Sequence, residues 1–143
     1  MIVTLPNHKH PYAIVKPERR AEKLGDISNA DIIDLYKEHG AILFRGFDGS
    51  VDAFAALGDR FISGSVAKHD LSRQSATPDH RVQTVNEGGQ EFYMHPEIGR
   101  EPWKPDMALF NCQIAPWRQG QTTIVDGVTI VEQLLDKTRE LLM

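Results

Sequence analysis

The chain has 143 residues, of which 41% are hydrophobic and 25% charged, and a formal net charge of −4. This composition and length are those of one soluble globular domain, which we expect to span residues 1–143. The charge is mild and unclustered, which argues against a nucleic-acid-binding tail, and no apolar run approaches the ~20 residues of a membrane-spanning helix. We expect a cytoplasmic protein without disulfides, whose one cysteine, Cys112, is buried in an apolar run.

The first half of the chain predicts two helices around one strand. Residues 1–27 are rich in proline and histidine and predict irregular structure. Ser28 and Gly40 are the expected N-cap and C-terminal stop of a helix over residues 29–39. The elements expected next are a buried strand over 41–47 and a second helix over roughly 51–61.

The second half predicts a long loop, several strands and a final helix. Residues 63–80 are polar and lack periodicity, which is typical of a loop. Strands are expected over 82–85, 92–95, 107–114 and 122–125, with a turn at 86–89 after the first of them. An amphipathic helix is expected over 129–143. Four or five strands are too few to close a barrel, so part of this sheet would lie uncovered.

The triplet His95-Pro96-Glu97 is the candidate metal-binding motif. In an extended chain, residues i and i+2 point to the same side, so the imidazole and the carboxylate would converge. One histidine and one carboxylate are two of the three ligands in the facial triad that holds non-haem Fe(II). An isolated triplet of this kind is also compatible with a plain surface turn.

The surroundings of this triplet resemble a known family. Blocks with family-like sequence occur in family order and with family-like gaps, at residues 40–47, 85–88, 92–97, 105–112, 115–122 and 125–127. From about residue 28 onward, the chain is similar to the N-terminal part of TauD/TfdA-like Fe(II)- and 2-oxoglutarate-dependent oxygenases. The resemblance implies an α+β fold: a partial double-stranded β-helix, or jelly roll, with N-terminal helices.

The resemblance also implies roles for four residues. His95 and Glu97 match two Fe(II) ligands, Thr122 matches the threonine that binds the 2-oxoglutarate carboxylate, and Asn86 matches a position on the substrate side. Thr122 is equally compatible with an ordinary strand residue, and Asn86 with a turn residue. Most of the family has aspartate at the position of Glu97. Glutamate at this position is similar to the clavaminate-synthase-like branch of the family, whose substrates are often derived from amino acids. In a completed site, Phe92, Met94, Leu109 and Phe110 are expected to form an apolar shell, and the same residues are also compatible with an ordinary core.

Two further groups of the family's site have no match in this sequence. The family has a third ligand, a distant downstream histidine, followed by an arginine for the cosubstrate, and no histidine follows His95 here. We therefore expect this chain to be inactive alone and to need a second chain or a C-terminal segment to complete its site. The expected substrate is a small molecule. Two alternatives stay open: a catalytically inactive or partner-dependent fragment, and a cupin-like small-molecule-binding module.

Overall fold

The computed structural model describes residues 1–63, 73–85, 93–97, 102, 104–118 and 120–142. The chain divides into two compact units: Met1–Phe47 together with Gln119–Met143, and Asp48–Arg118. Its described part mixes helices with one small sheet, so the α+β class is confirmed. No helix in these ranges is long and apolar enough to cross a membrane.

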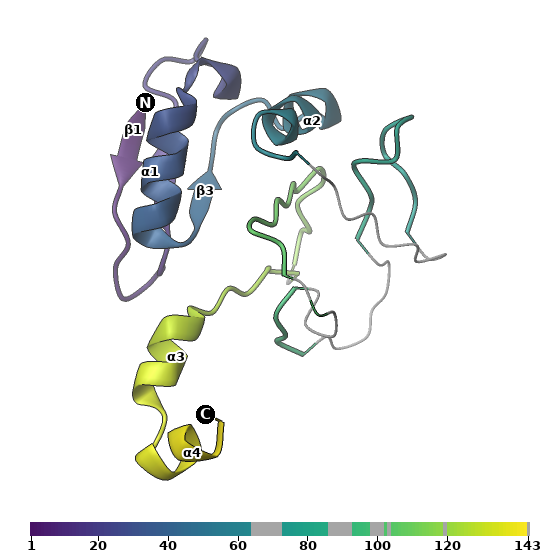
Figure 1. Ribbon diagram of the computed structural model, residues 1–143. Coiled ribbons are helices and arrows are strands. Elements are labelled where there is room, and N and C mark those ends of the chain that lie inside the picture. Colours follow the sequence, from purple (N-terminus) through teal and green to yellow (C-terminus); the bar gives the residue numbers. More distant parts are fainter. Residues whose placement is uncertain (64–72, 86–92, 98–101, 103, 119, 143) are drawn as a thin grey trace. The chain divides into compact units, whose positions relative to one another are not determined.

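The first unit contains a three-stranded sheet in the order β1 (Ile2–Thr4), β2 (Ala13–Lys16), β3 (Ile42–Phe44) (Figure 1). β1 runs antiparallel to β2, and β2 runs parallel to β3. The expectation of irregular structure over residues 1–27 was therefore wrong. These strands are too short to show a period in the sequence, and they are stabilised by pairing between segments that are distant along the chain.

Helix α1 (Asn29–His39) supplies the crossover that a parallel strand pair requires, and it packs against β3. Its predicted caps are confirmed. The Ser28 hydroxyl accepts a hydrogen bond from the Asp31 amide at 3.1 Å, and Gly40 ends the helix in the left-handed region, at φ 70°. A short 3-10 helix, η1 (Leu24–Asp26), precedes α1. Among the described residues, the buried apolar side chains are Ala13, Val15, Ile27 and Ile32 in this unit and Leu57 in the other.

The second unit has one regular element, helix α2 (Val51–Asp59), among its described residues. The Ser50 hydroxyl caps its start by accepting from the Ala53 amide at 3.2 Å. The helix ends two residues before the expected residue 61, and Leu57 and Gly58 are its buried residues.

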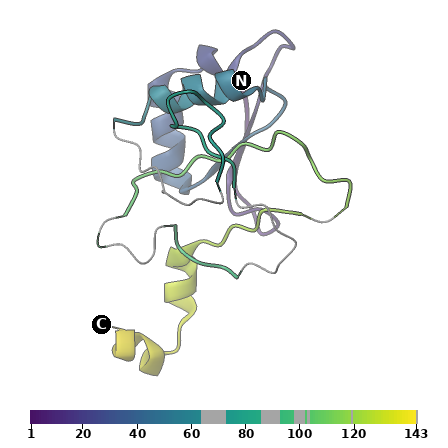
Figure 2. The same cartoon turned by 90° about the vertical axis from the view of Figure 1, so that its right-hand side faces the viewer.

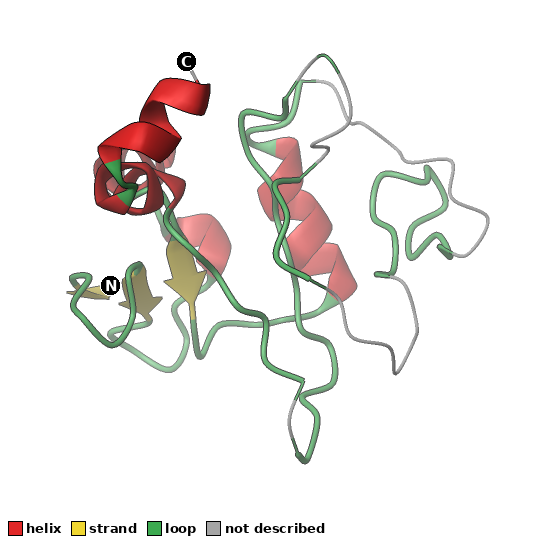
Figure 3. Cartoon of the chain, turned by 90° about the horizontal axis from the view of Figure 1, so that it is seen from below, coloured by secondary structure: helices red, strands yellow, loops and turns green. Residues whose placement is uncertain are grey.

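The strands predicted in the second half do not form in the described residues. Ser75 and Gln83 make an isolated bridge, while residues 84–85, 93–95, 107–114 and 122–125 lie outside any strand. The yellow arrows in Figure 3 are the strands of the N-terminal sheet. Residues 73–80 contain no helix or longer strand, as expected of a loop, and the predicted turn at 86–89 lies outside the described residues. A strand requires a hydrogen-bonded partner, and none of these segments has a partner strand within the described ranges.

One of these segments nonetheless shows the alternation of a strand. Along residues 105–111, every second side chain is partly buried, and the side chains of Asp106, Ala108 and Phe110 between them are exposed. This period of two is the pattern that predicted a strand. The predicted hydrogen-bonded pairing is therefore wrong for the described residues, whereas the predicted alternation of buried and exposed side chains is present.

The predicted C-terminal helix is two helices, α3 (Gly127–Gln133) and α4 (Asp136–Leu142) (Figure 2). Leu134 is extended, and the Arg139 guanidinium donates hydrogen bonds to the carbonyls of Val131 at 3.3 Å and Glu132 at 3.1 Å. A cationic group that donates to the last carbonyls of α3 stabilises the end of this helix at Gln133. The apolar side chains of Leu135, Leu141 and Leu142 are exposed.

Candidate functional site

His95 and Glu97 lie close together in the second unit. The His95 Nε2 atom is 4.0 Å from the Glu97 Oε1 atom, and the two side chains are 46% and 44% exposed. Neither residue is in a hydrogen-bonded strand, although the chain from Tyr93 to Pro96 has no turn or helix. The two side chains are therefore close together, as their i, i+2 spacing predicted.

A backbone contact orients the His95 ring. Its Nδ1 atom lies 2.8 Å from the carbonyl oxygen of Tyr93. A carbonyl only accepts hydrogen bonds, so Nδ1 carries the proton and the lone pair of the neutral ring is on Nε2, the atom that faces Glu97. Metal-binding histidines typically have this second contact, because it fixes both the tautomer and the ring orientation.

The two side chains fit a shared metal ion. Bonds of ~2.1 Å to nitrogen and to oxygen span at most ~4.2 Å, and at a right angle they place the two donors ~3.0 Å apart. The observed 4.0 Å therefore permits both atoms to contact one ion. A shift of the exposed Glu97 Oε1 atom by ~1 Å, through rotation of its side chain, would place the two donors at the right angle between adjacent ligands.

The described residues do not supply a third ligand. Within these ranges, no group of three or more His, Cys, Asp or Glu side chains is placed to hold a metal ion. His95 and Glu97 are thus a pair of candidate ligands, and their metal-binding role stays a prediction.

The structure does not test the other two predicted site residues. Thr122 is exposed in the connection before α3 and belongs to the first unit, so its role stays a prediction. Asn86 lies outside the described residues.

Two of the apolar residues expected around the site are exposed. Met94 is 57% exposed and Phe110 is 61% exposed in this chain, whereas Leu109 is partly buried and Phe92 lies outside the described residues. The shell was expected for a completed site, so it stays a prediction. Cys112 is exposed, which contradicts the expected burial of its thiol. An apolar run predicted this burial, but burial requires a covering layer, and the described residues provide none here.

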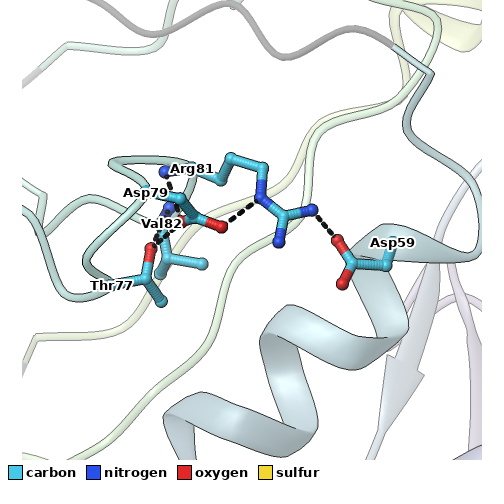
Figure 4. A network of polar contacts seen from close by, with 5 residues as sticks. All are labelled: Asp59, Thr77, Asp79, Arg81 and Val82. Carbon is cyan, nitrogen blue, oxygen red and sulfur yellow. Dashed lines mark hydrogen bonds and ion pairs between the residues drawn. The ribbon is translucent and has the colours of Figure 1, made fainter.

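A polar network that was not predicted from the sequence links α2 to residues 77–82 (Figure 4). Arg81 forms ion pairs with Asp59 at the end of α2 and with Asp79, whose Oδ2 accepts from Arg81 Nε at 2.5 Å. The Thr77 hydroxyl, together with Arg81, lowers the pKa of Asp79 to about 2. The turn residues Thr77, Pro78 and Asp79 signal a local turn, but no sequence signal connects Arg81 with Asp59.

Comparison with known proteins gives three findings. The family model described as "Taurine catabolism dioxygenase TauD, TfdA family" matches residues 11–143. A clavaminate synthase-like protein of Arabidopsis thaliana is 31% identical over 109 residues, which are 74% of this chain and 33% of that protein. This chain thus spans about a third of the length of that relative. No solved structure matches this chain.

Proposed function

Since the chain belongs to the TauD/TfdA family, we propose that it provides the first part of an Fe(II)- and 2-oxoglutarate-dependent dioxygenase site. The observation that carries this proposal is the His95–Glu97 pair, with the Tyr93 carbonyl holding the imidazole so that Nε2 faces the carboxylate. One nitrogen and one carboxylate oxygen are the donor types that non-haem Fe(II) sites use.

Within such a site, His95 and Glu97 hold the metal, Thr122 binds a carboxylate of 2-oxoglutarate, and Asn86 contacts the substrate. Fe(II) with 2-oxoglutarate supplies the oxidation of a substrate C–H bond by O2. The protein residues orient these groups and keep the reacting carbon in place. We propose a small, amino-acid-derived substrate, because Glu97 resembles the clavaminate-synthase-like branch and the Arabidopsis relative carries that name.

The rest of the site, in this proposal, comes from additional polypeptide, either a longer chain or a second one. It would supply the third ligand, a histidine, and an arginine for the cosubstrate, and would complete the jelly roll. Two observations support this: the chain matches about a third of its relative, and the leucines of α4 and the loop before it are 73–80% exposed. Exposed apolar surface of this kind is typical of a face that packs against another layer.

A second candidate function is a catalytically inactive fragment that acts through a partner. The exposed apolar residues of α3 and α4 favour it as well, and so does the lack of a three-ligand cluster among the described residues. The two candidates differ in metal binding: an inactive fragment has no need of His95 and Glu97 as ligands.

The test is a Mn(II) titration of the purified chain, read from the electron paramagnetic resonance signal of unbound Mn(II). Substitution of either ligand, by His95→Ala or Glu97→Gln, should weaken binding. The matched control His8→Ala, at an exposed histidine of the other unit, should not. Equal binding by all four proteins would reject the metal site.

A second assay separates a partial site from a complete one. With Fe(II), 2-oxoglutarate and O2, this chain alone should form no succinate at turnover rates, since its two ligands do not fix the ion in one geometry. Succinate formation that His95→Ala abolishes would show that the chain completes its own site.

A further inference from the structure

The chain that carries His95 and Glu97 is attached to helix α2 on both sides of the motif. On the N-terminal side, the Arg81 guanidinium forms an ion pair with Asp59, the last residue of α2 (Figure 4). On the C-terminal side, the carbonyl of Gly49, just before α2, accepts hydrogen bonds from the side-chain amides of Asn111 at 3.0 Å and Gln113 at 2.5 Å. All these residues belong to the second unit.

The N-terminal attachment is the end of an ordered turn. The backbone amide of Ala76 donates to the backbone carbonyl of Val82, and the backbone amide of Thr84 donates to the backbone carbonyl of Gln74, both at 2.8 Å. Inside this turn, the Asp79 carboxylate accepts from the Thr77 hydroxyl at 2.7 Å and from Arg81. The guanidinium is therefore held by two carboxylates, one within the turn and one on α2, and it fixes the turn to the helix.

The position of Asp59 favours such a partner. The C-terminal end of a helix carries a partial negative charge, so a carboxylate there is unfavourable unless a cation compensates it. Arg81 is that cation. Arginine suits the position because its planar, forked group can donate to two carboxylates at once, which the ammonium group of lysine does less well.

We propose that the Asp59–Arg81 pair is a positioning device for the metal ligands, an inference that rests on the proposed function. Fixing both ends of a chain segment reduces the number of conformations open to the residues between them. His95 and Glu97 lie between the two attachments in sequence, so the pair lowers the conformational cost of bringing them onto one ion. Arg81 and Asp59 act through the chain and do not touch the metal.

The size of the effect follows from the exposure of the pair. Arg81 and Asp59 are 50% and 48% exposed, and exposed ion pairs are weak and are screened by salt. Loss of the pair should therefore weaken Mn(II) binding by roughly two- to fivefold at low salt. The difference should shrink at high salt.

The test compares three substitutions in α2 by the same Mn(II) titration. Asp59→Asn removes the attachment and should weaken binding, whereas the conservative Asp59→Glu retains a carboxylate and should restore most of it. Asp52→Asn is the matched control, since it removes an exposed carboxylate from the first turn of the same helix. It should leave the Mn(II) affinity unchanged.

A purely structural role would give a different result. Asparagine at the C-terminal end of α2 relieves an unfavourable charge, so Asp59→Asn should not lower the helical content measured by circular dichroism. Weaker metal binding with unchanged helicity, rescued by Asp59→Glu, supports positioning. Asp59→Asn binding like wild type, while His95→Ala binds more weakly, overturns this inference and leaves the proposed function intact. His95→Ala binding like wild type rejects both.

Discussion

The Nδ1 atom of His95 lies 2.8 Å from the carbonyl oxygen of Tyr93, two residues earlier in the chain. Through this contact, the backbone decides which ring nitrogen carries the proton. The same contact also turns Nε2 toward Glu97. The motif is thus partly organised by contacts within the five residues from Tyr93 to Glu97, before any metal or further polypeptide is involved.

A first prediction concerns the tautomer of His95. In its neutral form, the ring should be protonated on Nδ1, because the Tyr93 carbonyl can only accept a hydrogen bond. Two-dimensional ¹H–¹⁵N spectra that resolve both ring nitrogens measure this directly. His8, an exposed histidine, provides the comparison. Protonation of His95 predominantly on Nε2 would contradict the contact and would remove the orienting role of Tyr93.

A second prediction concerns Thr122 in an enzyme completed by further polypeptide. Thr122→Ala should raise the apparent KM for 2-oxoglutarate by the equivalent of ~1.5–3 kcal/mol, the usual contribution of a hydrogen bond to a charged group. Steady-state assays with varied 2-oxoglutarate measure it, and Thr123→Ala is the matched control next in the chain. An unchanged KM would mean that Thr122 has no part in cosubstrate binding.

A third prediction concerns the acid stability of the 77–82 turn. The pKa of Asp79 is lowered from 3.8 to about 2, first by the Thr77 hydroxyl and then by Arg81. The folded-state pKa is below the usual value, so the ionised carboxylate stabilises the native turn above about pH 4. This contribution is lost as the pH falls from 3.8 toward 2.

Carboxyl ¹³C titration should locate the Asp79 midpoint near 2. Thr77→Val should move it upward, because the substitution removes the largest cause of the shift. Thr84→Val is the control: its hydroxyl accepts from the Gln74 amide at 3.0 Å and does not contact Asp79. A midpoint near 3.8 in the wild-type chain would show that the turn does not persist in solution.

A fourth prediction concerns the cap of α1. Ser28→Ala removes the hydroxyl that accepts from the Asp31 amide, and it should lower the free energy of unfolding by ~1 kcal/mol. Ser28→Asp retains an acceptor and should be close to wild type. Urea unfolding followed by circular dichroism measures both. Equal stabilities of Ser28→Ala and Ser28→Asp would show that the cap is not formed.

The sequence was most informative where the structure is determined by neighbouring residues. The caps and bounds of α1, the start of α2 and the convergence of His95 and Glu97 all depend on contacts within about four residues. Such short-range contacts leave a pattern in the sequence.

The sequence was least informative where a distant partner decides the structure. β1 and β2 were missed because each is defined by its pairing, and the predicted strand over 107–114 lacks a ladder in the described residues. The break between α3 and α4 depends on Arg139 reaching back to carbonyls seven and eight residues earlier. The Asp59–Arg81 pair is a long-range contact of the same kind, and neither residue marks it in the sequence.

The alternating segment at 105–111 has a consequence for the behaviour of this chain at high concentration. Residues 107–112, Met-Ala-Leu-Phe-Asn-Cys, are uncharged and free of proline, which is the composition of segments that stack into cross-β fibrils. Lys104, Pro105 and Asp106 precede them, and charges and proline at such a border act as gatekeepers against self-association. The His95–Glu97 pair is therefore followed by a fibril-prone segment that charges and proline protect at one border, and substitution of Lys104 and Asp106 by alanine would favour amyloid growth.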